Sequence, residues 1–199
     1  MIVKVCGIMN LDDARRALDE GANALGFNFY AKSPRCVTAD QAGTILEELE
    51  GTTALFVGVF VRGYSFMDAR MAFGSADVHP KVTVVQLHGF KSPAELPDLG
   101  KRVFVAVSAG QIGLFPDHEI IIDSSWGTGR VDDWEALRNL GRPYILSGGL
   151  TPSNVGVAIE TLHPAGVDVC SGVESSPGRK DPEKLRQFMK EVRRVYGEF

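Results

Sequence analysis

The sequence predicts an α/β fold in which the chain closes into a single (β/α)8 TIM barrel. Two observations lead to this prediction: short apolar runs alternate with amphipathic segments along the chain, and eight such runs are present. Strand–helix alternation indicates a parallel sheet, and eight units in about 200 residues favour a closed barrel over an open doubly wound sheet. The open sheet, which binds ligands where its strand order reverses, is the alternative. Because the chain contains no linker and no low-complexity stretch, we expect residues 1–199 to form one domain.

The predicted strands are rich in Val, Ile and Phe and are bounded by Gly, Pro, Asn or Ser, as is typical of buried parallel strands. They are Ile2–Ile8, Ala24–Phe29, Ala54–Val61, Val82–Leu87, Val103–Val107, Ile120–Ile122, Tyr144–Leu146 and Gly166–Val169.

The predicted helices follow capping residues and carry an apolar face. Thr38 and Gln41, for example, form a capping box. The fifth unit differs, because Ser108–Asp117 contains two glycines and a proline, so we expect its helix to be weak or missing. The predicted helical segments are Leu11–Glu20, Ala42–Leu49, Ser65–Phe73, Ala94–Leu99, Trp134–Leu140, Thr151–Leu162 and Asp181–Tyr196.

Composition and charge exclude several classes of protein. The formal net charge of −4 provides no basic surface for nucleic acid and no polybasic patch for a membrane. No apolar run has the length of a transmembrane helix, and the N-terminus lacks a signal-peptide pattern. The three cysteines, Cys6, Cys36 and Cys170, form neither a disulfide framework nor a zinc motif. We therefore expect a cytoplasmic protein without a metal, either a monomer or a homodimer, whose partner is a small molecule.

Polar residues interrupt the apolar runs near their C-terminal ends, where barrels of this kind place their active sites. They are Lys4, Cys6, Asn28, Gln86, His88, Asp123, Ser147 and Asp168. Taken singly, Cys6 resembles a buried structural thiol, and Gln86 with His88 resembles a satisfied core pair. A buried polar side chain nevertheless needs a partner or a function, and the convergence of eight favours a functional site.

Glycine-rich loops follow the last three predicted strands and suit a phosphate group. Barrels frequently bind phosphate at the loops after strands seven and eight, where backbone N–H groups favour an anion. Tight turns alone would also explain these glycines. The candidate phosphate-binding residues are Gly127, Gly129, Gly148, Gly149, Ser171 and Gly172.

Five motifs in order along the chain resemble the phosphoribosylanthranilate isomerase family. They are Val3–Ile8, Gly26–Arg35, Val85–Gly89, Leu146–Leu150 and Val167–Glu174. The resemblance implies an Amadori rearrangement in tryptophan biosynthesis, from N-(5-phosphoribosyl)anthranilate to 1-(2-carboxyphenylamino)-1-deoxyribulose 5-phosphate. It implies no metal and no organic cofactor. One departure is Cys170, which stands where the family has a serine.

The resemblance also implies roles for single residues: Cys6 as general base, Asp123 as general acid and Arg35 as clamp for the anthranilate carboxylate. Asn28, Gln86, His88 and Asp168 are expected to bind the substrate. Asp123 must hold a proton near neutral pH, and the three isoleucines before it provide desolvation that favours this. Lys4 shares a strand face with Cys6, so we expect its charge to lower the pKa of the Cys6 thiol.

Two other functions remain open at this point. A different phosphosugar isomerase or epimerase barrel would use paired acids and usually a histidine-containing metal site, for which the strand ends supply one histidine, His88. A non-catalytic phosphate-binding barrel would keep the glycine loops but would need neither Cys6 nor Asp123.

Overall fold

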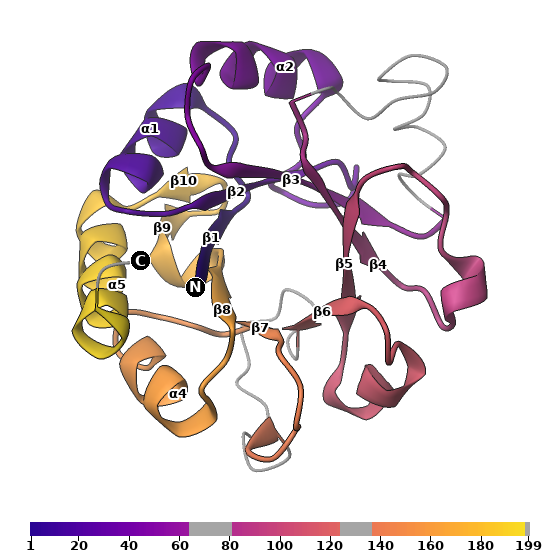
Figure 1. Cartoon of the computed structure of the whole chain (residues 1–199). Helices are drawn as coiled ribbons and strands as arrows, with labels where there is room; N and C mark the ends of the chain where they lie inside the picture. Colours follow the sequence, from indigo (N-terminus) through magenta and orange to yellow (C-terminus); the bar gives the residue numbers. More distant parts are fainter. Residues whose placement is uncertain (64–80, 124–136, 198–199) are drawn as a thin grey trace.

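The computed structural model describes residues 1–63, 81–123 and 137–197, and these form a ring of parallel strands surrounded by helices (Figure 1). β1 pairs in parallel with β8, which closes the ring, so the alternative of an open sheet is wrong. The strands of the barrel are β1 (Ile2–Cys6), β2 (Ala24–Asn28), β3 (Leu55–Val61), β4 (Val84–His88), β5 (Arg102–Val107), β6 (Glu119–Asp123), β7 (Ile145–Ser147) and β8 (Gly166–Val169).

Each strand lies where the sequence predicts one, with ends that shift by one or two residues. β1 ends at Cys6 rather than at Ile8. The reason is Gly7, whose φ of +73° lies in the left-handed region and turns the backbone out of the strand. β4 and β6 extend to His88 and Asp123, so these polar side chains belong to the strands themselves.

The four α-helices of the described residues lie outside the ring of strands (Figure 1). They are α1 (Leu11–Asp19), α2 (Ala39–Glu48), α4 (Val155–Leu162) and α5 (Pro182–Tyr196). The predicted capping box of Thr38 and Gln41 is confirmed at the start of α2. Asp181 caps α5, where its side chain accepts hydrogen bonds from two backbone N–H groups. Not one of the helices in the described ranges combines the length and apolar character that a membrane crossing requires.

Two helix predictions are wrong in extent. The predicted helix Ala94–Leu99 is only a 3-10 turn, η1 (Pro93–Glu95), because Leu96 precedes a proline and adopts an extended conformation. The helix predicted from Thr151 begins at Val155, since the side chain of Asn154 instead accepts a hydrogen bond from the Thr151 N–H at 2.8 Å.

The prediction of a weak fifth helix is confirmed, because that unit contains only the 3-10 helix η2 (Ala109–Leu114). The predicted helix Ser65–Phe73 lies outside the described residues, as do residues 134–136 of the predicted helix Trp134–Leu140. The described residues 137–140 of that segment contain a turn rather than an α-helix.

Two apolar layers hold the barrel together. The outer faces of the strands pack against the helices in the larger core. Inside the ring, a smaller cluster is formed by Ala24, Val57, Val84, Phe104, Ile121 and Ile145. Since strand side chains alternate, Ile121 lies two positions before Asp123 on the same face, and Ile145 two before Ser147. The barrel interior is therefore apolar around these six residues and polar at the C-terminal ends of the strands.

A short hairpin connects β8 to α5. It consists of the 3-10 turn η4 (Ser171–Val173), β9 (Glu174–Ser176) and β10 (Arg179–Lys180), and the two strands pair antiparallel. The hairpin lies beside the ends of β1 and β8 (Figure 1).

Candidate active site

A cavity of about 520 Å³ opens at the C-terminal mouth of the barrel. Cys6 from β1 and Asp123 from β6 line this one cavity, as the sequence predicts for a base and an acid that act on the same substrate. The other predicted residues that line it are Asn28, Arg35, Gln86, His88, Gly148, Gly149, Asp168 and Ser171. Gly127 and Gly129 lie outside the described residues.

The Cys6 thiol lies in a space that β2 leaves open, because a Cβ atom at Gly26 would lie 2.7 Å from the Cys6 Sγ. A hydrogen bond from the Cys170 thiol and, after it, the charge of Lys4 lower the pKa of Cys6 to about 6, although burial opposes this. A substantial fraction of Cys6 is therefore thiolate at neutral pH, which is the form that accepts a proton.

Lys4 is fully buried and forms an ion pair with Asp168, with 2.8 Å between Lys4 Nζ and Asp168 Oδ1. Ser147 Oγ donates a hydrogen bond of 2.9 Å to the other oxygen of Asp168. Burial would lower the pKa of Lys4, but the charges of Asp168 and Cys6 raise it above its usual value. Lys4 therefore stays cationic beside Cys6, and Asp168 serves as its counter-ion in addition to lining the cavity.

Gln86 and His88 are in contact on the inner face of β4, with 2.8 Å between Gln86 Nε2 and His88 Nε2. Burial lowers the pKa of His88, so its ring is neutral and can accept the amide hydrogen of Gln86. The Gln86 Oε1 is buried and has no hydrogen-bond partner within the described ranges. Among the described residues, the Gln86 oxygen therefore remains an acceptor that a ligand in the cavity can use.

Arg35 lines the cavity, and its guanidinium is held by Glu174. Arg35 Nε and Nη2 donate to the two carboxylate oxygens of Glu174 at 2.9 and 2.7 Å. Lys180 Nζ donates to Glu174 Oε1 at 3.0 Å. The sequence motif contains Glu174, but neither Glu174 nor Lys180 was predicted as a site residue. Arg35 and Glu174 lie 139 positions apart, so no local pattern in the sequence indicates their contact.

Glycines shape the two described loops of the three that were predicted to bind phosphate. Gly148 and Gly149 have φ angles of +89° and +67°, in the left-handed region that favours glycine. Gly172 does not line the cavity in the described part of the chain. A Cβ atom there would lie 1.8 Å from the Leu150 carbonyl oxygen, so this glycine allows the two loops to approach each other.

Comparison with known proteins identifies the family of this chain. Residues 3–191 match the family model for N-(5'phosphoribosyl)anthranilate (PRA) isomerase. The N-(5'-phosphoribosyl)anthranilate isomerase of Geobacter sp. (strain M21) is 39% identical to this chain, over 97% of this chain and 98% of its own length.

Solved structures of the same enzyme have the same fold. The monomeric form of the dimeric phosphoribosylanthranilate isomerase from Thermotoga maritima has a TM-score of 0.81 at 34% identity, covering 98% of this chain and 100% of that one. A phosphoribosyl anthranilate isomerase in complex with reduced 1-(o-carboxyphenylamino)-1-deoxyribulose 5-phosphate has a TM-score of 0.78 at 32% identity, with the same coverage. The chain thus belongs to the N-(5'-phosphoribosyl)anthranilate isomerase family and is an isomerase of tryptophan biosynthesis.

Proposed function

We propose that the chain converts N-(5-phosphoribosyl)anthranilate to 1-(2-carboxyphenylamino)-1-deoxyribulose 5-phosphate with Cys6 as general base and Asp123 as general acid. The observation that carries this proposal is that both side chains line one cavity, from strands β1 and β6 of the ring. A general acid and a general base must both reach the same substrate, and a shared cavity satisfies this requirement.

Asp123 acts in the first step. Its carboxyl group donates a proton to the ribose ring oxygen while the bond between C1 and that oxygen breaks. The electron pair on the anthranilate nitrogen forms a double bond to C1, which gives a protonated imine. The buried apolar residue Ile121, two positions before Asp123 on the same strand face, lies below this carboxyl group inside the ring.

Cys6 acts in the second step. The protonated imine acidifies the hydrogen at C2, and the Cys6 thiolate removes it. The resulting enolamine gains a proton at C1 and loses the proton of its C2 hydroxyl group, which gives the ketone product. The proton gained at C1 balances the one that Cys6 removed, and the hydroxyl proton replaces the one that Asp123 donated, so the reaction is an isomerisation without net change in atoms. Lys4 and Cys170 favour the thiolate in the resting enzyme, which makes Cys6 available as a base.

Binding groups surround these two residues. Glu174 occupies one edge of the Arg35 guanidinium. The other edge donates hydrogen bonds to the anthranilate carboxylate, because the planar guanidinium can bind a carboxylate through two parallel N–H groups. The backbone of Gly148 and Gly149, with Ser171, binds the phosphate at the same mouth. Asn28, Gln86, His88 and Asp168 contact the ribose part. We expect the enzyme to act in the cytoplasm as a monomer or homodimer.

The two other functions have less support. A non-catalytic phosphate-binding barrel gives no reason for a buried cation and a thiol that together lower the pKa of Cys6. An epimerase with a metal site gives no reason for Arg35 beside Cys6.

The test of the proposed function is a fluorescence assay of the purified protein that follows the loss of N-(5-phosphoribosyl)anthranilate. We expect turnover without added metal, and the same turnover in Cys36→Ser, since Cys36 does not line the cavity. A protein that binds the substrate without consuming it would instead be a binding barrel.

A further inference from the structure

A cluster of charged side chains extends from the cavity wall into the protein, and two of its members, Glu174 and Lys180, have no part in the proposed proton transfers. The cluster consists of Arg35, Glu174 and Lys180. The side chain of Lys180 is 0% exposed and that of Glu174 is 4% exposed, and of the three only Arg35 lines the cavity. Burying charges costs desolvation free energy, and apolar residues of similar size often give equal or greater stability. Stability is therefore a weak reason for this cluster to exist.

On one side, Glu174 fixes the orientation of Arg35. Both carboxylate oxygens accept hydrogen bonds from the guanidinium, through Nε and Nη2, in a bidentate arrangement. The Gly178 N–H donates to Glu174 Oε1 at 3.3 Å, which ties the carboxylate to the hairpin. Arg35 thus has one edge held from behind, and its opposite edge, which includes Nη1, is left for a second carboxylate in the cavity.

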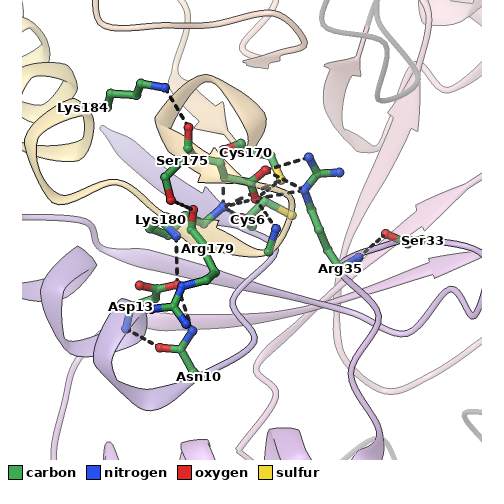
Figure 2. Close-up of polar contacts among 12 residues, drawn as sticks. Cys6, Asn10, Asp13, Ser33, Arg35, Cys170, Ser175, Arg179, Lys180 and Lys184 are labelled. Carbon is green, nitrogen blue, oxygen red and sulfur yellow. Dashed lines mark hydrogen bonds and ion pairs between the residues drawn. The ribbon is translucent and has the colours of Figure 1, made fainter.

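On the other side, Lys180 joins the strand ends that carry Cys6 and Cys170 (Figure 2). Its Nζ donates to the Cys6 carbonyl at 2.6 Å and to the Cys170 carbonyl at 3.3 Å. The last registered pair of these strands is Val5 with Val169, so Cys6 and Cys170 are the next neighbours. The ammonium group therefore holds together the two positions whose thiols interact.

The backbone of Lys180 is fixed as well. Its N–H donates to Asp13 Oδ2 at 3.0 Å, and Asp13 in turn accepts a hydrogen bond from the Asn10 side chain, which caps α1 (Figure 2). Lys180 is thus anchored to the first helix. It contacts the Cys6 carbonyl directly, and it is linked to Arg35 through Glu174.

We propose that Glu174 and Lys180 are positioning residues for the isomerisation: Glu174 aims Arg35 at the substrate carboxylate, and Lys180 fixes the end of β1 that carries Cys6. This inference rests on the proposed function, since it takes Arg35 as the clamp and Cys6 as the base.

The first test is the variant Glu174→Gln. Both oxygens of Glu174 accept from donors, so the amide group of glutamine would face a donor on one side or the other. We expect the apparent KM to rise at least about tenfold while kcat stays within about threefold, because the lost hydrogen bonds involve charged groups. The matched control is Lys184→Met, because Lys184 Nζ also bonds to Glu174, but at its backbone carbonyl, at 2.8 Å. The control should keep the wild-type KM.

A double-mutant cycle shows whether Glu174 acts through Arg35. If it does, Arg35→Ala and the double variant Arg35→Ala/Glu174→Gln have the same KM, since the second change has nothing left to misplace. Additive effects, or an unchanged KM in Glu174→Gln, overturn the role given to Glu174.

The second test is Lys180→Met, with folding checked by circular dichroism and thermal unfolding. We expect kcat to fall at least about tenfold, since small displacements of a reacting group are costly. We also expect iodoacetamide to alkylate Cys6 at a changed rate, as located by peptide mass spectrometry. A folded variant with wild-type kcat and alkylation rate overturns the role given to Lys180. If this variant does not fold, the Glu174→Gln series decides the proposal.

These results can be told apart from a failure of the proposed function. If the wild-type protein does not consume N-(5-phosphoribosyl)anthranilate, the proposed function is wrong. The alkylation rates of Cys6 in wild type, Lys180→Met and Lys184→Met still test the link between Lys180 and the thiol. If the wild type is active but its variants behave like it, only the positioning roles are wrong.

Discussion

The glycine at position 26 leaves the space in which the Cys6 thiol lies. A methyl group there would approach the Cys6 Sγ to 2.7 Å and the Cys6 Cα to 3.1 Å, and Lys4 Cε lies equally close at 3.1 Å. A side chain at this position therefore displaces the Cys6 thiol or the strand that carries it.

We predict that Gly26→Ala lowers kcat at least about tenfold and destabilises the protein by about 1–3 kcal/mol, as expected for overpacking. The measurements are turnover and urea unfolding. Gly110→Ala is the control, because a Cβ atom there meets nothing within 4 Å. Wild-type turnover in Gly26→Ala would show that the thiol position is not critical.

The titration of Cys6 depends on its neighbours. Because the hydrogen bond from Cys170 and the charge of Lys4 lower the pKa of Cys6 to about 6, its alkylation by iodoacetamide should be half-maximal near that pH and should decline as the pH falls further.

Lys4→Met removes the cation that stabilises the Cys6 thiolate. The negative charge of Asp168, which disfavours the thiolate, remains. We predict that the midpoint of Cys6 alkylation rises by at least about one pH unit. An unchanged midpoint in a folded variant would mean that Lys4 does not activate the thiol. Folding must be verified, since the change leaves a buried carboxylate without its partner.

The sequence predicts the residues that interrupt apolar strands, such as Cys6 and Asp123, because a polar group in a buried strand is visible as a break in the pattern. It does not predict Glu174 as the partner of Arg35. These two residues lie 139 positions apart, and only the closure of the ring brings them into contact. Pairings of this kind depend on tertiary geometry that spacing along the chain does not contain.

At the scale of elements, α5 shows how local signals and packing agree. Asp181 caps it, Pro182 occupies its first turn, and its buried face is formed by Leu185, Phe188, Met189 and Val192. This spacing matches one side of a helix and explains why the helix is predicted correctly from the sequence.

We predict that Phe188→Ala lowers the free energy of unfolding by about 3–5 kcal/mol, since the ring is fully buried and a cavity would remain. Gln187→Ala, at a neighbouring exposed position, should change it by less than about 0.5 kcal/mol. Urea unfolding measures both. Equal effects of the two substitutions would show that this face of α5 does not hold the helix to the barrel.

Elements without such agreement are predicted less well. The segment after Pro93 has helix-forming residues, but Pro97 prevents Leu96 from continuing a helix. At Thr151, the side chain of Asn154 makes a turn and delays the start of α4 until Val155. In both cases a single residue prevents the helix that the composition of the segment favours.

At the scale of the whole molecule, ring closure turns the order of the strands into an active site. The C-terminal ends of the strands point to one mouth, and β8 joins β1 so that the last loops lie beside the first strand. The apolar cluster inside the barrel closes the floor of that mouth. The sequence predicts this arrangement because eight alternating units in about 200 residues favour a closed barrel.

The central claim is that Cys6 and Asp123, from strands β1 and β6 of the ring, are the base and the acid for one substrate. The most direct measurement is the kcat of Cys6→Ser and Asp123→Asn with N-(5-phosphoribosyl)anthranilate, with Cys36→Ser as the control and circular dichroism to verify the fold. We predict that each of the two variants loses at least about 10²-fold in kcat while the control is unaffected. A folded variant of either residue with near-normal kcat would contradict the account.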